Sequence, residues 1–231
     1  MSQTRVIEIA CGSASFGVNA YLLLGRRPVL VDTGVADCAE HILAALACEG
    51  FVPRDVSLIV LTHGHLDHTG SVRELAQRTG APVAVHVADA GHVRAGTSAP
   101  VEGRTRLGKM IAGIVRRQDE AGAVSDAGVE PTILLSGGES LAEYGIDARV
   151  LHTPGHTDGS ISLLLEQGPA LIGDLVQGKL FDKHRPVPSV FAVDSAQMLE
   201  SIRSVIAHEP ATIYASHSVP FGLEQMRAAF A

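Results

Sequence analysis

The stretch VSLIVLTHGHLDHTG, residues 56–70, places three histidines and an aspartate within six positions, directly after an apolar run. The run at 56–61 has the length of a strand. Its apolar character, interrupted only by Ser57, is typical of a strand that is buried on both faces of a sheet. The polar cluster that follows therefore stands at the carboxyl end of a buried strand, where a turn begins. This position predicts an α/β protein with a functional site at one edge of a sheet.

The four polar residues of this turn have the chemistry of metal ligands. His63 and His65 are two positions apart, so in an extended segment their side chains point the same way and can share one ion. Asp67 and His68 follow as the chain turns into a helix, and they can face a second point. Imidazole and carboxylate groups suit zinc and similar divalent ions. We therefore expect one loop to serve two adjacent metal ions.

Two ions need further ligands, and three later residues follow apolar runs in the same way. His156 lies in a Pro-Gly turn after a strand pattern, Asp174 ends the run ALIGD, and His217 ends the run ATIYASH. Each residue would be delivered by a strand end to the same edge of the protein. Together with the first motif, these residues complete a candidate set for a binuclear site.

Short apolar runs alternate with helical patterns along the rest of the chain. We predict helices from a capping box of Asp37 and Glu40, over about 70–79, and from an N-cap at Asp194. This order predicts a single domain, residues 1–231, in which two sheets pack face to face with helices outside, a four-layer sandwich. The predicted strands are 5–10, 20–25, 28–34, 56–61, 81–86, 147–153, 160–166, 170–174 and 211–217.

Composition limits the class of protein. The chain has 231 residues, 46% of them apolar, and its formal charge of −7 argues against a nucleic-acid-binding protein. We interpret Cys11, Cys38 and Cys48 as buried thiols of a reducing compartment, because they form no CxxC pair. The sequence shows no signal peptide and no run long enough to span a membrane. We therefore expect a cytoplasmic protein that binds neither nucleic acid nor a membrane.

Residues 94–130 interrupt the alternation of strands and helices and predict an inserted helical cap. Its first part, from Arg94 to Arg117, carries six basic residues against one acid, Glu102. Either this segment attracts an anionic substrate, or it is a solvated helix face that packs on the body or on a dimer partner. The candidates for substrate contact are Arg106 and Lys109 in this segment, and Lys179, His184 and Arg185 in the stretch after Asp174.

The ordered set of motifs resembles the metallo-β-lactamase superfamily, in its glyoxalase II-like hydrolase branch. The resemblance covers residues 28–217 and implies an αββα sandwich with two metal ions, zinc first and iron or manganese as alternatives. It implies that Asp32 supports a ligand histidine through hydrogen bonds. By the same resemblance His63, His65 and His156 hold the first ion, Asp67, His68 and His217 hold the second, and Asp174 bridges both.

The resemblance implies hydrolysis of a thioester, ester or lactone by a metal-bridging hydroxide, with Asp67 as the catalytic residue that orients the nucleophile. The substrate would be a small molecule, and an anionic one if the basic segment contacts it. The sequence leaves open whether the chain forms a homodimer. Antibiotic-hydrolysing zinc β-lactamases typically carry a cysteine at the position of Asp174. The aspartate therefore favours the glyoxalase II, lactonase and thioesterase branches of the superfamily. One alternative is a persulfide dioxygenase with a single iron, and another is a non-catalytic, metal-stabilised binding protein.

Overall fold

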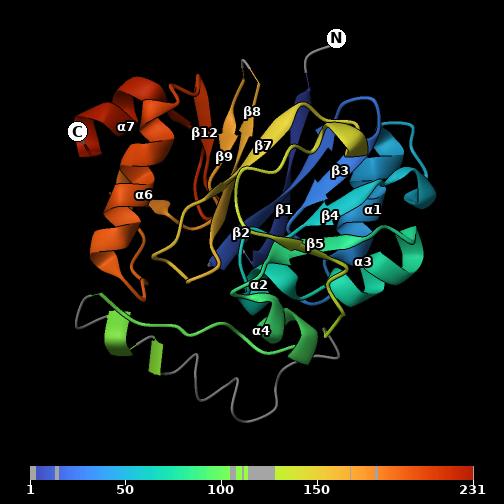
Figure 1. Cartoon of the computed structure of the whole chain (residues 1–231), viewed down its shortest axis with the longest axis horizontal. Coiled ribbons are helices and arrows are strands. Elements are labelled where there is room, and N and C mark those ends of the chain that lie inside the picture. Colours follow the sequence, from blue (N-terminus) through green and yellow to red (C-terminus); the bar gives the residue numbers. More distant parts are fainter. Residues whose placement is uncertain are drawn as a thin grey trace.

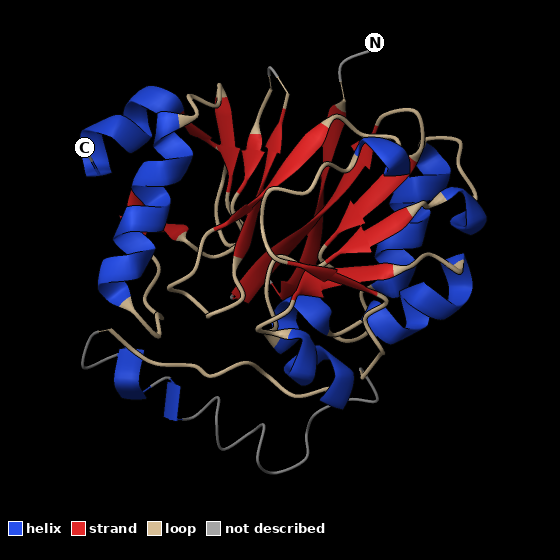
Figure 2. Cartoon of the chain, in the orientation of Figure 1, coloured by secondary structure: helices blue, strands red, loops and turns tan. Residues whose placement is uncertain are grey.

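Two sheets pack face to face in the structure, a computed structural model, and helices cover both outer faces (Figures 1 and 2). The described residues are 4–13, 16–104, 108–110, 112–113, 128–166, 168–179 and 182–230. The first half of the described chain forms one sheet with its helices, and the second half forms the other. The predicted four-layer α/β sandwich is therefore confirmed.

The first sheet has six strands in sequence order. A long antiparallel hairpin leads into four parallel strands, which need crossover connections between them. The strands are β1 (Arg5–Ser13), β2 (Phe16–Leu24), β3 (Pro28–Val31), β4 (Leu58–Val60), β5 (Val83–His86) and β6 (Ile133–Leu135).

The second sheet has five strands in the order β13-β12-β9-β8-β7, and a two-stranded hairpin lies outside it. Strand β12 runs parallel to β9, while β8 runs antiparallel to both of its neighbours. The strands are β7 (Ala148–His152), β8 (Ile161–Leu165), β9 (Ala170–Leu171), β12 (Thr212–Tyr214) and β13 (Phe221–Gly222), and the hairpin is formed by β10 (Val176–Lys179) and β11 (Asp182–Pro188).

Three buried apolar clusters separate the four layers. Strand β4 illustrates this arrangement. Ile59 packs in the cluster between the first sheet and its outer helices, while Leu58 and Val60 pack in the cluster between the two sheets. Successive strand side chains point to opposite faces, so a strand in this position must be apolar throughout. The outer helices are α1 (Ala39–Cys48) and α3 (Val72–Thr79) on the first sheet, and α6 (Ser195–Ala207) and α7 (Leu223–Phe230) on the second.

Shorter helical turns complete the described chain. They are η1 (Pro53–Asp55), α2 (Leu66–Thr69), α4 (Ala90–Ala95) and η2 (Ala142–Tyr144). Of the predicted inserted cap at 94–130, residues 108–110 and 112–113 are helical, while residues 105–107, 111 and 114–127 lie outside the described residues. The predicted domain boundaries therefore stay predictions.

One of the two predicted caps is confirmed and the other is wrong. The side chain of Asp194 accepts hydrogen bonds from the backbone nitrogens of Ala196 and Gln197 at the start of α6. Helix α1 instead begins after Cys38 without a side-chain cap, and Asp37 has a left-handed φ of 68°. The turn before α1 uses the tolerance of aspartate for this conformation rather than its capping ability.

The interpretation of all three cysteines as buried thiols is wrong. Cys11 on β1 and Cys38 before α1 form a disulfide, and Cys48 is exposed. The two bonded cysteines are 27 positions apart in the sequence and meet only because α1 packs on the first sheet. None of the described helices is long and apolar enough to cross a membrane. The expected cytoplasmic location stays a prediction.

Candidate metal centre

The candidate ligands meet at one edge of the sandwich because the strands that precede them point the same way. Strands β3 and β4 are parallel, and they deliver Asp32 and His63 to this edge. In the second sheet, β9 and β12 are parallel and are followed by Asp174 and His217. The two sheets are joined here by a hydrogen bond from the backbone nitrogen of Ile161 to the carbonyl of Thr62, at 2.9 Å.

The first group of ligands is formed by His63, His65 and His156. His65 Nδ1 lies 3.1 Å from His63 Nε2 and 3.0 Å from His156 Nε2. A single ring nitrogen carries either a proton or a lone pair, so it cannot satisfy both neighbours by hydrogen bonding. Two nitrogens that are each about 2.0–2.1 Å from a tetrahedral zinc ion lie about 3.3 Å apart. The three nitrogens are therefore spaced as ligands of a common cation.

The second group is formed by Asp67, His68 and His217. His217 Nε2 lies 3.2 Å from an oxygen of Asp67, and His68 Nε2 lies 3.9 Å from the same oxygen. Asp174 stands between the groups, with one oxygen 3.2 Å from His217 Nε2 and 3.6 Å from His156 Nε2. The geometry thus brings together all seven residues that the sequence proposed, in the two subsets and with the central aspartate implied by the resemblance.

The second ring nitrogen of several ligand histidines has a partner that fixes the orientation of the ring. Nδ1 of His156 lies 3.0 Å from the carbonyl of Phe191, and Nδ1 of His217 lies 2.8 Å from the carbonyl of Gly17. These bonds keep the proton on Nδ1 and leave Nε2 free to face the centre. Such outer contacts are a usual feature of metal-binding histidines.

Asp32 has the supporting position that the resemblance implies. One of its oxygens lies 2.9 Å from His68 Nδ1 and accepts a hydrogen bond from the hydroxyl of Thr62 at 2.8 Å. Its other oxygen accepts a bond from the backbone nitrogen of Thr62 at 2.7 Å. The Thr62 hydroxyl in turn lies 3.0 Å from His63 Nδ1. Asp32 therefore orients His68 of the second group directly, whereas it reaches His63 of the first group only through Thr62.

Two buried atoms at the centre have no hydrogen-bond partner among the described residues. They are His68 Nε2 and Asp174 Oδ1, which lie 3.4 Å apart. A buried polar atom without a partner costs free energy, so each such atom in a folded protein calls for an explanation. Both atoms face the other ligands, and a bound cation would satisfy them. The residues present therefore fit divalent ions.

Electrostatics differ between the two groups. Burial lowers the pKa of His63 well below its usual value and lowers the pKa of His156 to about 4. Burial also opposes protonation of His217, but Asp174 and Asp67 outweigh it and raise its pKa to about 10. The first group is therefore ready to bind an ion at neutral pH, whereas an ion entering the second group has to displace a proton.

The centre is open on the side of the second group. The side chains of Asp67 and His217 are 41% and 29% exposed, whereas His63, His65 and His156 are buried. Residues 96–104, which we call the crossing segment, run from α4 toward α6 along the edge that holds the centre (Figure 1). In this segment Ala99 donates to the carbonyl of Gly64. A substrate would therefore approach past Asp67 and His217.

Two of the basic residues proposed for substrate contact line a groove that none of the candidate ligands lines. His184 and Arg185 line a groove of about 740 Å³ between β11, α6 and α7, and none of the seven candidate ligands lines it. Lys179 and Lys109 are exposed, and Arg106 lies outside the described residues. Their role in substrate binding stays a prediction.

Two other arginines of the basic segment are engaged within the chain. Arg94 pairs with Glu130, with Nη2 at 2.8 Å from a carboxylate oxygen. Arg104 donates from its guanidinium to the carbonyl of Ser189 at 2.9 Å and to the hydroxyl of Ser195 at 3.1 Å. Arg104 therefore anchors the crossing segment, and it is not a free cation for an anionic substrate.

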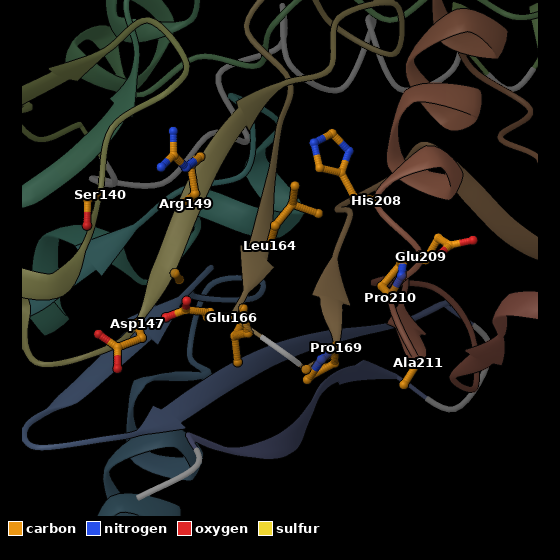
Figure 3. A pocket seen from close by; sticks show the side chains of 13 residues that line it. Ser140, Asp147, Arg149, Leu164, Glu166, Pro169, His208, Glu209, Pro210 and Ala211 are labelled. Atoms are coloured by element: carbon orange, nitrogen blue, oxygen red, sulfur yellow. The ribbon is translucent and has the colours of Figure 1, made fainter. Parts of the chain in front are cut away.

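Figure 3 shows a different cavity, of about 530 Å³, at the opposite end of the second sheet. Asp147 and Arg149 come from the start of β7, Leu164 from the end of β8, and His208 from the segment before β12. None of the seven candidate ligands lines it, and His156, Asp174 and His217 follow the opposite ends of β7, β9 and β12. We assign no function to this cavity.

Sequence reasoning missed Asp89, a buried carboxylate beside the centre. It follows the carboxyl end of β5, as the recognised candidates follow other strands, and this position was the available signal. His86 and His92 lie three positions to either side of Asp89, but they do not show the two-residue spacing of the first motif, so the sequence did not distinguish Asp89 from an ordinary helix cap. Thr157, which directly follows His156, was missed because a hydroxyl is not among the usual ligand groups of zinc.

The chain is similar to several known proteins. A probable metallo-hydrolase of Methanocaldococcus jannaschii is 26% identical over 70% of this chain and 68% of its own length, and the probable metallo-hydrolase YflN of Bacillus subtilis is 29% identical over 87% and 78%. A metallo-β-lactamase family protein of Thermus thermophilus superposes with a TM-score of 0.72 at 26% identity, covering 96% of this chain and 76% of that one.

A structure of TTHA1623 in a di-iron-bound form superposes with a TM-score of 0.69 at 24% identity, over 97% of this chain and 98% of the other, which shows the shared fold. The sequence profile of the metallo-β-lactamase superfamily matches residues 15–217, a span that contains all seven candidate ligands. This chain therefore belongs to the metallo-β-lactamase superfamily.

Proposed function

We propose that the protein is a metal-dependent hydrolase that binds two divalent ions and cleaves a thioester, ester or lactone of a small substrate. The observation that carries the proposal is the convergence of four buried histidines, Asp67, Asp174 and His217 at one open edge of the sandwich. The names of two relatives, both probable metallo-hydrolases, support the same class of reaction. The buried histidines are His63, His65, His68 and His156.

Divalent ions at such a site supply an acidified water molecule and polarise a substrate carbonyl. In the hydrolysis, the acyl carbon gains a bond to the water oxygen and loses its bond to sulfur or oxygen. The proton released from the water has to reach the leaving group. Asp67 is the exposed carboxylate of the centre, and we assign it to orient the attacking water and carry this proton.

Zinc is our first candidate for the ions, because four or more imidazole and carboxylate ligands at this spacing suit it. Iron is the second candidate, since the same ligand types bind iron and a fold neighbour, TTHA1623, has a di-iron-bound form. An iron-containing protein that consumes oxygen with a persulfide would support the dioxygenase alternative instead. A folded, metal-loaded protein without any turnover would support the non-catalytic alternative.

The test is hydrolysis of a thioester, an aryl ester and a lactone by protein reconstituted with zinc or with iron. We expect turnover of at least one substrate class, its loss on treatment with a chelator and its return with metal. The variant Asp67→Asn should lose at least a hundredfold in kcat, by the size of a typical general acid–base contribution of about 10²–10⁴.

A matched control is Glu166→Gln, which removes a carboxylate from the cavity of Figure 3 at the other end of the sheet. This control should keep the activity of the unmodified protein. A folded protein with both ions bound that hydrolyses none of the three substrate classes would refute the proposed reaction.

A further inference from the structure

Asp89 is a buried carboxylate that lies beside the metal centre without belonging to the ligand set. It is 2% exposed and stands at the N-cap position of α4. Aspartate in this position usually accepts a bond from the first turn of its helix, but the side chain of Asp89 makes no such bond. It reaches away from α4, so its role has to be sought in what it contacts.

Three donors meet the carboxylate of Asp89. One oxygen accepts from the backbone nitrogen of Gly64 at 2.8 Å and from the hydroxyl of Thr157 at 2.8 Å. The other oxygen accepts from the backbone nitrogen of Gly159 at 3.0 Å. Gly64 comes from the first half of the chain, and Thr157 and Gly159 come from the second. Asp89 is thus a hydrogen-bonded junction between two loops that are distant in sequence.

These two loops carry the three histidines of the first group. Gly64 lies between His63 and His65, and Thr157 directly follows His156. The distance between His65 Nδ1 and His156 Nε2, 3.0 Å, therefore depends on how the two loops are held relative to each other. The backbone nitrogens of Gly64 and Gly159 donate the hydrogen bonds to Asp89, so these bonds hold the two loops relative to each other.

Asp89 packs closely against the backbone of both loops. A Cβ atom at Gly159 would lie 2.6 Å from an oxygen of Asp89, and a Cβ atom at Gly64 would lie 3.2 Å from its Cβ. The Thr157 hydroxyl also lies 2.9 Å from the hydroxyl of Ser160. The Ser160 hydroxyl accepts a hydrogen bond from the backbone nitrogen of Thr157 at 3.0 Å. Glycines stand where the carboxylate approaches the backbone most closely.

The second group has a separate anchor. Asp32 bonds directly to His68 and to Thr62, on the other side of the first motif. We propose that Asp89 is the positioning residue of the first metal subsite, formed by His63, His65 and His156, and that it acts on this subsite independently of the second. The inference rests on the metal centre of the proposed function, but not on the reaction that the centre performs.

The experiment measures the affinity for each of two zinc ions by competition with a chromophoric chelator, on the full chain. Loss of a hydrogen bond to a metal ligand from outside the ligand set typically lowers metal affinity about 10–100-fold. We therefore expect Asp89→Asn to lower the affinity for one ion by this factor and to change the affinity for the other by no more than about threefold. Asp158→Asn, which changes an exposed carboxylate of the same loop, should leave both affinities unchanged.

A double-variant comparison assigns the weakened ion to a subsite. In the background His156→Ala, which removes a ligand of the first subsite, Asp89→Asn should not change the affinity for the remaining ion. In the background His217→Ala, Asp89→Asn should lower the affinity for the remaining ion as much as it does in the unmodified protein. Contacts that act through one site are expected to be non-additive in this way.

A milder pair of variants covers the case in which Asp89→Asn fails to fold. Thr157→Val removes one of the three donors and should weaken the same ion, while Thr157→Ser keeps the hydroxyl and should restore its affinity. Equal weakening of both ions by Thr157→Val or Asp89→Asn in folded protein, or no change in either, would overturn the inference. Normal zinc binding without any hydrolysis would refute the proposed function and leave this inference standing.

Discussion

Asp32 and His68 form a fully buried pair, in which a carboxylate oxygen of Asp32 lies 2.9 Å from Nδ1 of His68. Asp32 also has a left-handed backbone, with φ of 59°, which asparagine tolerates far better than most residues. Asp32→Asn should therefore keep the backbone of the turn but lose the charged acceptor. We expect the affinity for one ion to fall by about 10–100-fold, as measured by competition with a chelator.

The same substitution tests which subsite Asp32 supports. The weakened ion should be the one that His217→Ala also removes, because both variants act on the second group. An Asp32→Asn protein that binds both ions as tightly as the unmodified chain would contradict this role.

Gly70 allows the helix after the first motif to approach the turn that carries Asp32. A Cβ atom at this position would lie 2.4 Å from the backbone nitrogen of Ala36 and 2.5 Å from the carbonyl carbon of Val35. Since backbone atoms cannot move aside easily, Gly70→Ala should lower the free energy of unfolding by about 1–3 kcal/mol, in the range of an overpacked core. Urea unfolding of the two proteins measures the difference.

Gly91 in α4 is the matched control for this prediction. Nothing lies within 4 Å of a Cβ atom built on it, and its backbone does not have a positive φ. Gly91→Ala should leave stability unchanged or raise it by about 0.5–1 kcal/mol. Equal stability losses at both glycines would show that close approach is not the cause.

The disulfide between Cys11 and Cys38 should contribute measurable stability. It closes a loop across 27 positions of sequence, and the loss of loop-closure entropy in the unfolded chain corresponds to about 3–4 kcal/mol for a loop of that length. Cys38→Ser should lower the free energy of unfolding by roughly this amount, whereas Cys48→Ser should have little effect. Thiol titration under denaturing conditions should find one free thiol before reduction and three after it.

Protonation of His86, whose ring stacks on that of His152, should destabilise the folded chain. Their rings are 3.9 Å apart and nearly parallel, and burial together with the charge of His152 lowers the pKa of His86 below its usual value of 6.5. The unfolded chain therefore binds more protons than the folded chain just below pH 6.5, so the stability due to neutral His86 is present above this pH and is lost as pH falls toward the folded-state pKa.

NMR titration of the histidine rings checks this directly. The pKa of His86 should lie below 6.5 and should rise in His152→Gln, where only burial still lowers it. Between pH 7.5 and 5.5 the unmodified protein should also lose more stability than this variant. A pKa of His86 at or above 6.5 in the unmodified protein would contradict the prediction.

Much of the metal centre could be predicted because strand ends and ligand chemistry are both local in sequence. His63, His65, Asp67 and His68 stand together after a buried strand, and His156, Asp174 and His217 each follow an apolar run. The layers of the fold followed from the same alternation of strands and helices. These features depend on short-range periodicity, which a single sequence displays.

Features that depend on long-range contacts were not predictable in the same way. Cys11 and Cys38 approach only once α1 packs on the first sheet, and the role of Asp89 depends on two loops that are joined by folding. The cap predicted at Asp37 failed because the disulfide-bonded turn takes a left-handed backbone there. Hairpin β10–β11 was absent from the predicted strands, since its residues show no clear alternation of apolar and polar side chains.

The most direct test of the central claim is the number and identity of metal ions in protein purified without added metal or chelator, determined by elemental analysis. The account predicts two divalent ions per chain, one of them lost in His156→Ala and the other in His217→Ala. A chain that binds no metal ion even when zinc or iron is supplied, while it remains folded, would contradict the account.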